Sequence, residues 1–485
     1  MNRHIATLIA AALIVSAAGC GESLNSSFVY SEQTKSLMRE AQKGFPAEGE
    51  VKALPGARQL IDERFGDPQS LKAWSKLPVD FGGVTGRVVE TPDSSIAIKE
   101  LILEFDTDVV VEEGTPLSIQ FVTGSAAKGA GGPTVVDIES WSAEKGKASL
   151  SAAMSPEAAP VAGDVVVLDG GGVLQHGRGL YMRHCSHCHG TSGDGNGPTA
   201  QYLVPRPRDY RQGVFKFTST NDQAKISRDD LHRVLKNGIP GTYMPSFVPM
   251  LNEDDKHAVV EYVRFLAMRG EFEKKIGVEL SPDFSKAAVT ARIEGGESKP
   301  EIVESLREFL AEDMADSLEF VSDDLETAWT TADTDGAVIT PDMSRVPDSP
   351  ESRRLGRELY LSKGINCADC HGIAGKGDGP QTTIFEKNPV TQQLYDTPGL
   401  HDVWDNVNQP RNLTRGIYRG GRRPIDLFRR IHAGIKGSRM PSFKIVPHEQ
   451  IWHIVNYVLS IPFEVEPGHA PVVNASAEAT PQASL

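Results

Sequence analysis

Two short clusters of cysteine and histidine are the residues of this sequence best suited to do chemistry. They read Cys185-Ser-His-Cys188-His189 and Cys367-Ala-Asp-Cys370-His371, so each has the pattern CxxCH. This spacing lets two thiols add to the two vinyl groups of a haem while the adjacent imidazole reaches the iron from the same turn. The clusters therefore predict two covalently bound haem c groups, with His189 and His371 as iron ligands.

Two other chemistries also use paired cysteines. A structural zinc site could combine both pairs, but zinc motifs do not require a histidine directly after the second cysteine. A thioredoxin-like CxxC should follow a strand in a βαβ pattern, whereas glycine-rich loops follow the motifs here. With the fifth cysteine, Cys20, assigned to the N-terminal segment, none is left over for a disulfide. Haem attachment is the favoured interpretation.

The two clusters lie within a longer internal repeat. Similar sequence precedes the motifs at residues 177–181 and 356–360, and a glycine loop ending in proline follows each of them. Later, both copies read Gly-Ile-x-Gly-x-x-Met-Pro-Ser-Phe, at residues 238–247 and 434–443. The chain therefore contains one haem-binding unit twice.

Met244 and Met440 hold matching positions in this repeat. A thioether is a soft ligand suited to low-spin iron, and ligation by methionine and histidine raises the reduction potential. A lone methionine is more often a core side chain, but the repeated Met-Pro-Ser-Phe reverses that expectation. We expect Met244 and Met440 to be the sixth iron ligands, and Met250 and Met268 to serve packing.

Helical patterns surround both motifs. Residues 176–184 and 353–363 have the mixed charged and apolar composition of a helix leading into each motif. A capping box beginning at Ser227 indicates a middle helix, and apolar residues recur at helical spacing in 253–269 and 448–460. The predicted fold is mainly α, with two tandem helical domains preceded by a β-containing N-terminal region.

Each copy resembles a class I cytochrome c domain, and together they resemble the dihaem cytochromes c of bacterial respiratory chains. The resemblance covers residues 172–268 and 352–463, less than half of the chain. It implies that the proline ending each glycine loop, Pro198 or Pro380, turns its carbonyl toward the other nitrogen of the ligand histidine. Such a bond fixes the ring and raises its basicity.

The resemblance also implies that the first and last helices of each domain pack through a glycine and two aromatic residues. The matching positions are Gly177, Tyr181 and Tyr262 in the first copy and Gly356, Tyr360 and Tyr457 in the second. The second copy departs from the first by three extra residues, 364–366, and by an insertion around residues 385–410. This insertion is expected to cover or expose one haem edge.

The N-terminal segment predicts export. A basic start, an apolar run from Ile5 to Ala18 and small residues at its end describe a signal peptide over residues 1–19. The ending Ala-Ala-Gly-Cys20 resembles a bacterial lipobox, although leucine is usual at its first position. We expect a periplasmic or otherwise extracytoplasmic protein held on a membrane by lipid at Cys20, with plain secretion as the alternative. No other stretch reaches the ~18–20 apolar residues of a membrane-spanning helix, so the body is expected to be soluble.

Composition assigns the remaining regions. Residues 20–165 are a β-rich N-terminal region of unknown role, and an Ala/Gly/Ser/Pro-rich stretch at 143–163 indicates a linker. The first haem domain is expected at 166–270 and the second at 351–465, followed by a disordered tail at 466–485. The predicted strand runs are 84–90, 96–104, 108–111, 117–122 and 164–168.

Charge is distributed unevenly along the 485 residues. The net charge of −15 argues against a nucleic-acid binder that works through its overall field. Residues 271–350 hold 20 acidic and 7 basic residues, which predicts an acidic linker between the haem domains. This segment could be a flexible tether, an amphipathic helix around Ile302 to Leu318, or a mask over a basic face of the second domain.

The expected basic face belongs to residues 351–485, which hold 16 basic and 13 acidic residues. One or two of its arginines could pair with haem propionates, and the others could steer an acidic partner or form a solvated surface. Its members are Arg411, Arg415, Arg419, Arg422, Arg423, Arg429, Arg430, Lys436 and Arg439.

The predicted iron ligands favour an electron carrier over an enzyme, because six-coordinate iron leaves no position for a substrate. Such a carrier would take single electrons from a membrane dehydrogenase or quinol-oxidising complex and pass them to a small cytochrome or terminal oxidase. The alternatives are a dihaem enzyme such as a peroxidase, and a haem subunit of a larger oxidase or dehydrogenase complex. We expect no catalytic residue in the carrier.

Overall fold

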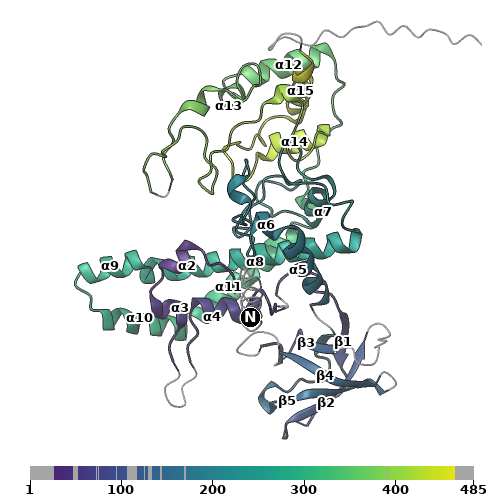
Figure 1. The fold of residues 1–485 in the computed structure, drawn as a ribbon, viewed down its shortest axis with the longest axis vertical. Coiled ribbons are helices and arrows are strands. Elements are labelled where there is room, and N and C mark those ends of the chain that lie inside the picture. The colour runs from purple at the N-terminus through teal and green to yellow at the C-terminus, as the bar shows by residue number, and fades with distance from the viewer. Residues whose placement is uncertain are drawn as a thin grey trace, which may run out of the picture. The chain divides into compact units, whose positions relative to one another are not determined.

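The structure is a computed structural model that describes residues 27–464 except 47–52, 73, 75, 94, 106–116, 125, 129–133, 143, 144, 169, 170 and 390. These residues divide into two compact units (Figure 1). Unit 1 comprises Met1–Ser75, Phe81–Gln175 and Glu273–Ala315, and unit 2 comprises Lys76–Asp80, His176–Phe272 and Asp316–Leu485. The predicted signal peptide, Cys20 and the tail 466–485 lie outside the described residues. Among the helices of the described residues, none has the length and apolar character of a membrane span.

A closed antiparallel barrel forms the β-rich part of unit 1. Its strands follow the order β1-β2-β5-β4-β3-β6, and the pairing of β1 with β6 closes it. Alternate side chains point inward and form an apolar core in which Ile119, Phe121 and Val166 are fully buried. The strands are β1 (Val84–Val88), β2 (Ile98–Phe105), β3 (Leu117–Phe121), β4 (Val135–Ser142), β5 (Lys147–Met154) and β6 (Val165–Leu168).

Two of these strands differ from the expectation. β4 was not predicted, and β5 lies inside the stretch expected to be a linker. Alanine and serine favour strands weakly, but β5 pairs with β2 on one side and β4 on the other, and this pairing outweighs propensity. Ala148 and Leu150 of β5 are buried in the barrel core. The strand run predicted at 108–111 lies outside the described residues.

Short helices from distant parts of the sequence pack together in the rest of unit 1. The backbone N–H of Met38 donates to the carbonyl of Phe284 at 2.8 Å, and the guanidinium of Arg307 lies 4.6 Å from the ring centroid of Phe45. A capping box at Ser298 starts α10. The helices are α2 (Glu32–Ser36), α3 (Arg39–Lys43), α4 (Ala57–Phe65), α9 (Lys286–Glu294) and α10 (Lys299–Glu312).

The acidic interval 271–350 is largely helical, so it is not a flexible tether. α8 (Glu253–Phe284) continues beyond residue 269, where the predicted helix ended, because its apolar stripe continues. The helix predicted around Ile302 to Leu318 is present as α10 and α11 (Met314–Thr331), with a break at Asp313. The buried stripe of α8 includes Phe272, Ile276, Leu280 and Phe284.

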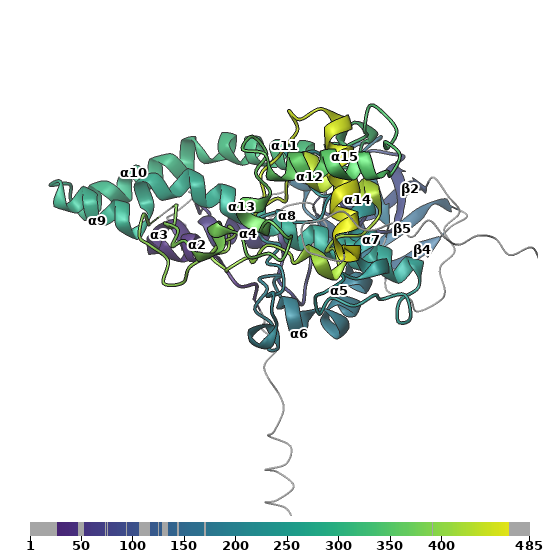
Figure 2. The same cartoon turned by 90° about the horizontal axis from the view of Figure 1, so that it is seen from above.

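The two repeat units have the same series of helices. Every predicted helix is present, and Ser227 caps α7 by accepting a hydrogen bond from the backbone of Asp230. The first and last helices of the second repeat unit, α12 and α15, lie side by side in both views (Figures 1 and 2). The first repeat unit contains α5 (Gly172–His184), α6 (Ser186–His189), α7 (Arg228–Asn237) and the start of α8; the second contains α12 (Pro350–Leu361), α13 (Ala368–His371), α14 (Pro424–Ala433) and α15 (His448–Ser460).

Residues 333–346, which we call the strap, bind both repeat units in turn. The backbone N–H of Ile339 donates to the carbonyl of Ser219 in the first repeat unit at 2.9 Å. The carbonyl of Ile339 accepts from Nε of Arg429 in the second repeat unit at 3.0 Å. Nε of Arg345 then donates to Oδ1 of Asn456 at 2.7 Å. The repeat units are therefore joined by a bonded segment, with Ile339 in the core of the second.

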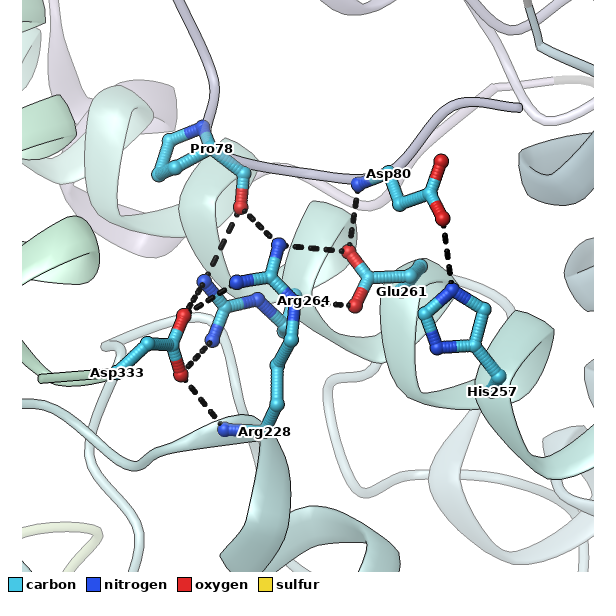
Figure 3. Close-up of polar contacts among 7 residues, drawn as sticks. All are labelled: Pro78, Asp80, Arg228, His257, Glu261, Arg264 and Asp333. Atoms are coloured by element: carbon cyan, nitrogen blue, oxygen red, sulfur yellow. Dashed lines mark hydrogen bonds and ion pairs between the residues drawn. The ribbon is translucent and has the colours of Figure 1, made fainter. Parts of the chain in front are cut away.

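A buried ion network holds the first end of the strap (Figure 3). Asp333 pairs with Arg228 and with Arg264, whose nitrogen lies 3.0 Å from the carboxylate. Arg228 also pairs with Glu261 at 2.7 Å and donates to the carbonyl of Pro78 at 2.7 Å. The side chains of Glu261 and Arg264 are fully buried, so each charge depends on the others for compensation.

Candidate functional site

Each CxxCH motif forms one helical turn that begins at its first cysteine. Cys185 and Cys367 are the N-cap residues of α6 and α13. The backbone N–H of His189 donates to the carbonyl of Cys185 at 2.9 Å, and the same bond joins His371 to Cys367 at 2.9 Å. Each motif therefore holds two thiols and an imidazole on one short turn, as covalent haem attachment requires.

None of the four cysteines of the motifs forms a disulfide among the described residues. Burial raises the pKa of the Cys185 thiol and of the Cys367 thiol to about 12. No three His, Cys, Asp or Glu side chains of the described residues form a metal-binding group, so the two cysteine pairs do not come together as the zinc interpretation requires.

A backbone carbonyl orients each ligand histidine. Nδ1 of His189 donates to the carbonyl oxygen of Arg208 at 3.1 Å. Nδ1 of His371 donates to the carbonyl oxygen of Arg411, also at 3.1 Å. Burial lowers the pKa of both imidazoles, that of His189 to about 4, so both are neutral at pH 7. With Nδ1 occupied, Nε2 of each ring is the nitrogen left to bind a metal.

The expectation that Pro198 and Pro380 accept these bonds is wrong. The Pro198 carbonyl accepts from the side chain of Gln201 at 3.5 Å, and that of Pro380 accepts from Thr383 at 2.9 Å. A later part of the chain supplies the carbonyl in both repeat units. The residues that sequence reasoning missed are Arg208 and Arg411. The shared Pro-Arg at 207–208 and 410–411 was the available signal.

The glycine loops permit this return. A Cβ added at Gly195 would lie 2.8 Å from the carbonyl oxygen of Pro207, and one at Gly377 would lie 2.5 Å from that of Pro410. Both glycines also have positive φ, +72° and +79°, which side chains rarely adopt. The loops are therefore glycine-rich because the arginine-bearing segment crosses them at backbone contact distance.

Tyrosines on the first helices support the histidine turns. The hydroxyl of Tyr181 donates to the carbonyl of Gly190 at 2.8 Å, and its ring meets that of Tyr262 edge-on at 5.1 Å. In the second repeat unit, the hydroxyl of Tyr360 donates to the carbonyl of Gly372 at 2.8 Å. Its ring meets that of Tyr457 at 5.4 Å. The expected contacts between first and last helices are confirmed.

Glycines allow those helices to approach closely. A Cβ at Gly177 would collide with the carbonyl of Ala258, and one at Gly356 with the carbonyl of His453. The first helix of each repeat unit thus lies directly against the backbone of the last, as the resemblance implied.

The methionine loops have the same geometry in both repeat units. The carbonyl of Met244 accepts from the N–H of Ile239 at 3.0 Å, and that of Met440 accepts from Ile435 at 3.1 Å. Both side chains are partly buried, and Met440 packs on the same core cluster as Cys367. The structure therefore gives the two methionines equivalent places, and their ligation of iron stays a prediction.

The donor set of each repeat unit fits a covalently attached haem. Each provides two thiols, a neutral imidazole with Nε2 available and a thioether on a fixed loop. Two buried nitrogens add to this fit: Nε1 of Trp404 and Nε of Arg419 have no hydrogen-bond partner among the described residues. The propionate carboxylates of a haem would supply acceptors for such groups.

Contacts within the chain occupy much of the expected basic face. Arg423 pairs with Asp426 at 2.8 Å, and Arg439 pairs with Glu386 at 3.2 Å. Arg430 donates to backbone carbonyls of its own domain. The acidic interval reaches this face through its backbone, since the carbonyl of Ile339 accepts from Nε of Arg429 at 3.0 Å. No carboxylate of residues 316–350, all of which are described, pairs with the nine basic residues.

Comparisons with known proteins identify the repeat units. Residues 172–263 match the family model described as cytochrome c oxidase, cbb3-type, subunit III, and residues 354–462 match the model for cytochrome c. The chain therefore contains two cytochrome c domains, preceded by the six-stranded barrel. Such domains imply haem c binding and support electron transfer through haem.

One solved structure also shows a likeness. It is the Kuenenia stuttgartiensis reducing HAO-like protein complex Kustc0457/Kustc0458, in which a chain has 21% sequence identity to this one. The match covers 59% of this chain and 96% of that chain, with a TM-score of 0.39, which supports no conclusion about fold or function. No curated protein matches the chain.

Proposed function

We propose that this protein is a dihaem c-type cytochrome that transfers single electrons between respiratory partners outside the cytoplasm. Haem c would be attached at Cys185 and Cys188 in the first domain and at Cys367 and Cys370 in the second. The observation that carries the proposal is the pair of hydrogen bonds from Nδ1 of His189 and from Nδ1 of His371 to backbone carbonyls, each at 3.1 Å, which leave Nε2 of each ring to bind iron.

The chain's own residues would hold and shield the redox centre. A bound haem c supplies a couple in which iron gains or loses one electron. His189 and His371 would bind the iron through Nε2, and Met244 and Met440 would close the sixth position against water. The carbonyls of Arg208 and Arg411 fix the imidazole rings, so that little rearrangement accompanies each change of charge.

The cellular setting is part of the proposal. An export signal over residues 1–19 and lipid at Cys20 would place the protein in the periplasm or another extracytoplasmic compartment, held at a membrane surface. Its partners would be redox proteins: a membrane dehydrogenase or quinol-oxidising complex as donor, and a small cytochrome or terminal oxidase as acceptor.

One observation favours a second candidate, a haem subunit of a larger oxidase. The model matched by the first domain is named for subunit III of a cbb3-type oxidase. Purification from native membranes under mild conditions distinguishes the two: a subunit would copurify with its complex in fixed proportion, whereas a carrier would separate from it.

Optical spectroscopy of the full-length holoprotein tests the carrier directly. We expect two covalent haems per chain, low-spin spectra in both oxidation states and no rapid reaction with peroxide. A high-spin component that reacts with peroxide would instead support the dihaem enzyme. The variant Arg354→Met is a matched control, because this exposed arginine pairs with Glu351 and Glu358 of its own helix.

A further inference from the structure

The two cytochrome c domains contact each other through equivalent residues. A Cβ added at Gly437 would lie 3.1 Å from Cγ1 of Val214. A Cβ added at Gly241, the repeat equivalent of Gly437, would lie 3.1 Å from Cγ2 of Ile417, the equivalent of Val214. Such reciprocal contacts are typical of an isologous interface with twofold symmetry.

At the centre of this interface, a residue of the first domain contacts the residue that holds the same repeat position in the second domain. Phe217 and Gly420 correspond in the repeat, and a Cβ added at Gly420 would lie 2.7 Å from the Phe217 ring. The two domains of one chain are therefore arranged like two copies in a dimer, with an approximate twofold axis near this contact.

Trp404 interrupts the symmetry. It belongs to the insertion in the second domain, so the first domain has no counterpart. The guanidinium of Arg208 lies 3.7 Å from the centroid of its ring. A Cβ added at Gly437 would lie 2.6 Å from Cζ3 of the same ring. Trp404 thus lies between the segment that orients the first ligand histidine and the methionine loop of the second domain.

Two cations of the first domain lie against Trp404: the guanidinium of Arg208 and Nζ of Lys216, the latter 5.9 Å from the ring centroid. Arg208 and Lys216 come from the first domain, and Arg411 and Arg419 occupy the equivalent positions in the second. Lys216 pairs with Asp402 at 2.9 Å, but the three arginines pair with no carboxylate of the described residues. Burial and neighbouring cations lower the pKa values of Arg419 and Lys216, that of Lys216 to about 8. Partly buried cations of this kind call for further anions.

Polar contacts hold the two domains in this arrangement. Nζ of Lys436 donates to Oγ1 of Thr220 at 3.2 Å, and Lys444 pairs with Asp222 at 2.8 Å. Together with the strap, these bonds make the separation of the two sites a property of the packed interface rather than of a long connection.

We propose that Trp404 is a positioning residue that couples the two haem sites, with Arg208 against its ring and its indole N–H directed to a haem propionate, so that electrons are exchanged within the chain across this interface. The proposal rests on the dihaem function proposed above. In each exchange one electron leaves a reduced site and enters the oxidised one, and no bond is made or broken.

The experiment measures internal exchange in the full-length holoprotein. A flash-generated reductant delivers less than one electron per chain, and the spectral relaxation that follows reports redistribution between the sites. We expect Trp404→Ala to slow this relaxation by about tenfold or more, because a small displacement of the reacting groups has a large effect on the rate. Lys444→Met is the matched control: it removes an interdomain ion pair at 2.8 Å but leaves Trp404 in place, so its rate should stay near that of the unaltered protein.

A second variant separates coupling from mere packing. Trp404→Phe keeps an aromatic ring but removes the N–H donor, so one propionate would lose a compensating contact. We expect the midpoint potential of one haem to fall while the unfolding transition stays nearly unchanged. A purely structural tryptophan would give the opposite pattern.

The remaining outcomes also decide the matter. Equal slowing in Trp404→Ala and Lys444→Met would overturn the proposal, because general loosening of the interface would then be the cause. Absence of any relaxation in the unaltered protein would overturn it as well. Low-spin, six-coordinate spectra at both sites would in either case leave the carrier function intact, so the two proposals fail separately.

Discussion

The two cytochrome c domains hold their ligand histidines in the same way but anchor their last helices differently. Glu261 in the first domain and Asn456 in the second are equivalent positions, and both side chains are fully buried. Glu261 pairs with Arg228 and accepts the backbone N–H of Asp80 at 2.7 Å. Asn456 instead accepts from Arg345 and donates to backbone carbonyls.

This difference shows which contacts the ligand chemistry constrains. The bonds from each histidine to a carbonyl and from each tyrosine to a glycine carbonyl have nearly equal lengths in the two domains. They lie next to the iron-binding groups. The contacts of the last helix lie farther away, and there one domain uses an ion network while the other uses a neutral amide.

Replacing the two methionines should produce the largest effects. Met244→Ala and Met440→Ala should each lower the potential of one haem by on the order of 100 mV or more, since axial ligands set haem potentials over about 0.8 V. Each should also produce a high-spin signal from one site. Potentiometric titration with optical detection measures both changes. The domains would differ in their ligands if only one variant showed these changes. Met250→Ala is the control, because Met250 is exposed and does not serve packing as the sequence predicted.

Replacing the buried carboxylate of Glu261 by a neutral amide should show how much the first domain depends on its ion network. Glu261→Gln should lower the free energy of unfolding by about 3–5 kcal/mol, because Arg228 would lose a buried partner and Arg264 a nearby negative charge. The unfolding transition of the holoprotein in denaturant measures the loss. Asn456→Gln keeps the amide and serves as the matched change in the second domain. A cost below about 1 kcal/mol for Glu261→Gln would mean that the ion network contributes little.

Removing the tyrosine hydroxyls should affect the two domains alike. Tyr181→Phe and Tyr360→Phe each leave a buried carbonyl without its donor, at a cost of about 1–3 kcal/mol. Denaturant unfolding followed at the haem absorbance gives the two values. Tyr202→Phe, at an exposed position, should change nothing. Unequal costs would show that only one histidine turn depends on this bond.

The smallest effect concerns Lys436, which occupies the position of Pro240 in the first domain. Burial lowers its pKa to about 8, while Asp230 and Asp222 oppose this shift and Lys225 adds to it. Between about pH 8 and the ordinary lysine value, the unfolded chain binds a proton that the folded chain does not, so stability should rise with pH.

The comparison with Lys436→Met isolates this contribution. Between pH 8 and pH 10, the free energy of unfolding of the unaltered protein should rise on the order of 1 kcal/mol more than that of the variant. Unfolding curves at matched pH values measure it, with Lys444→Met as the control at an exposed ion pair. Parallel pH profiles for all three proteins would show that Lys436 keeps its ordinary pKa.

The sequence predicted the parts of the site that depend on short spacing or on the repeat. The CxxCH turns and the equivalent methionine loops follow from local pattern or from matched positions, and the tyrosine and glycine contacts were implied by the resemblance to class I cytochromes c. The carbonyl acceptors did not, because Arg208 lies 19 residues and Arg411 lies 40 residues after the histidine that each one orients. No local rule indicates which later segment returns across a glycine loop.

Long-range pairing also explains the missed features of the fold. β5 is rich in alanine and serine and becomes a strand only because two other strands flank it. The strap has no periodic pattern, and its structure comes from partners such as Ser219 and Asn456, far away in the sequence. Trp404 gave no signal either, since its insertion has no counterpart in the repeat.

The burial of Ile339 has a practical consequence for dissecting the chain. A fragment that begins at residue 351 would keep all the haem-binding groups of the second domain yet lack this isoleucine, which is 6% exposed within that domain's core. Asn456 would also lose Arg345 and the carbonyl of Val346. A fragment that keeps the native contacts of the second domain must therefore start upstream of the strap. A protease cut inside residues 333–346 would remove some of these contacts before it separated the second domain from the rest of the chain.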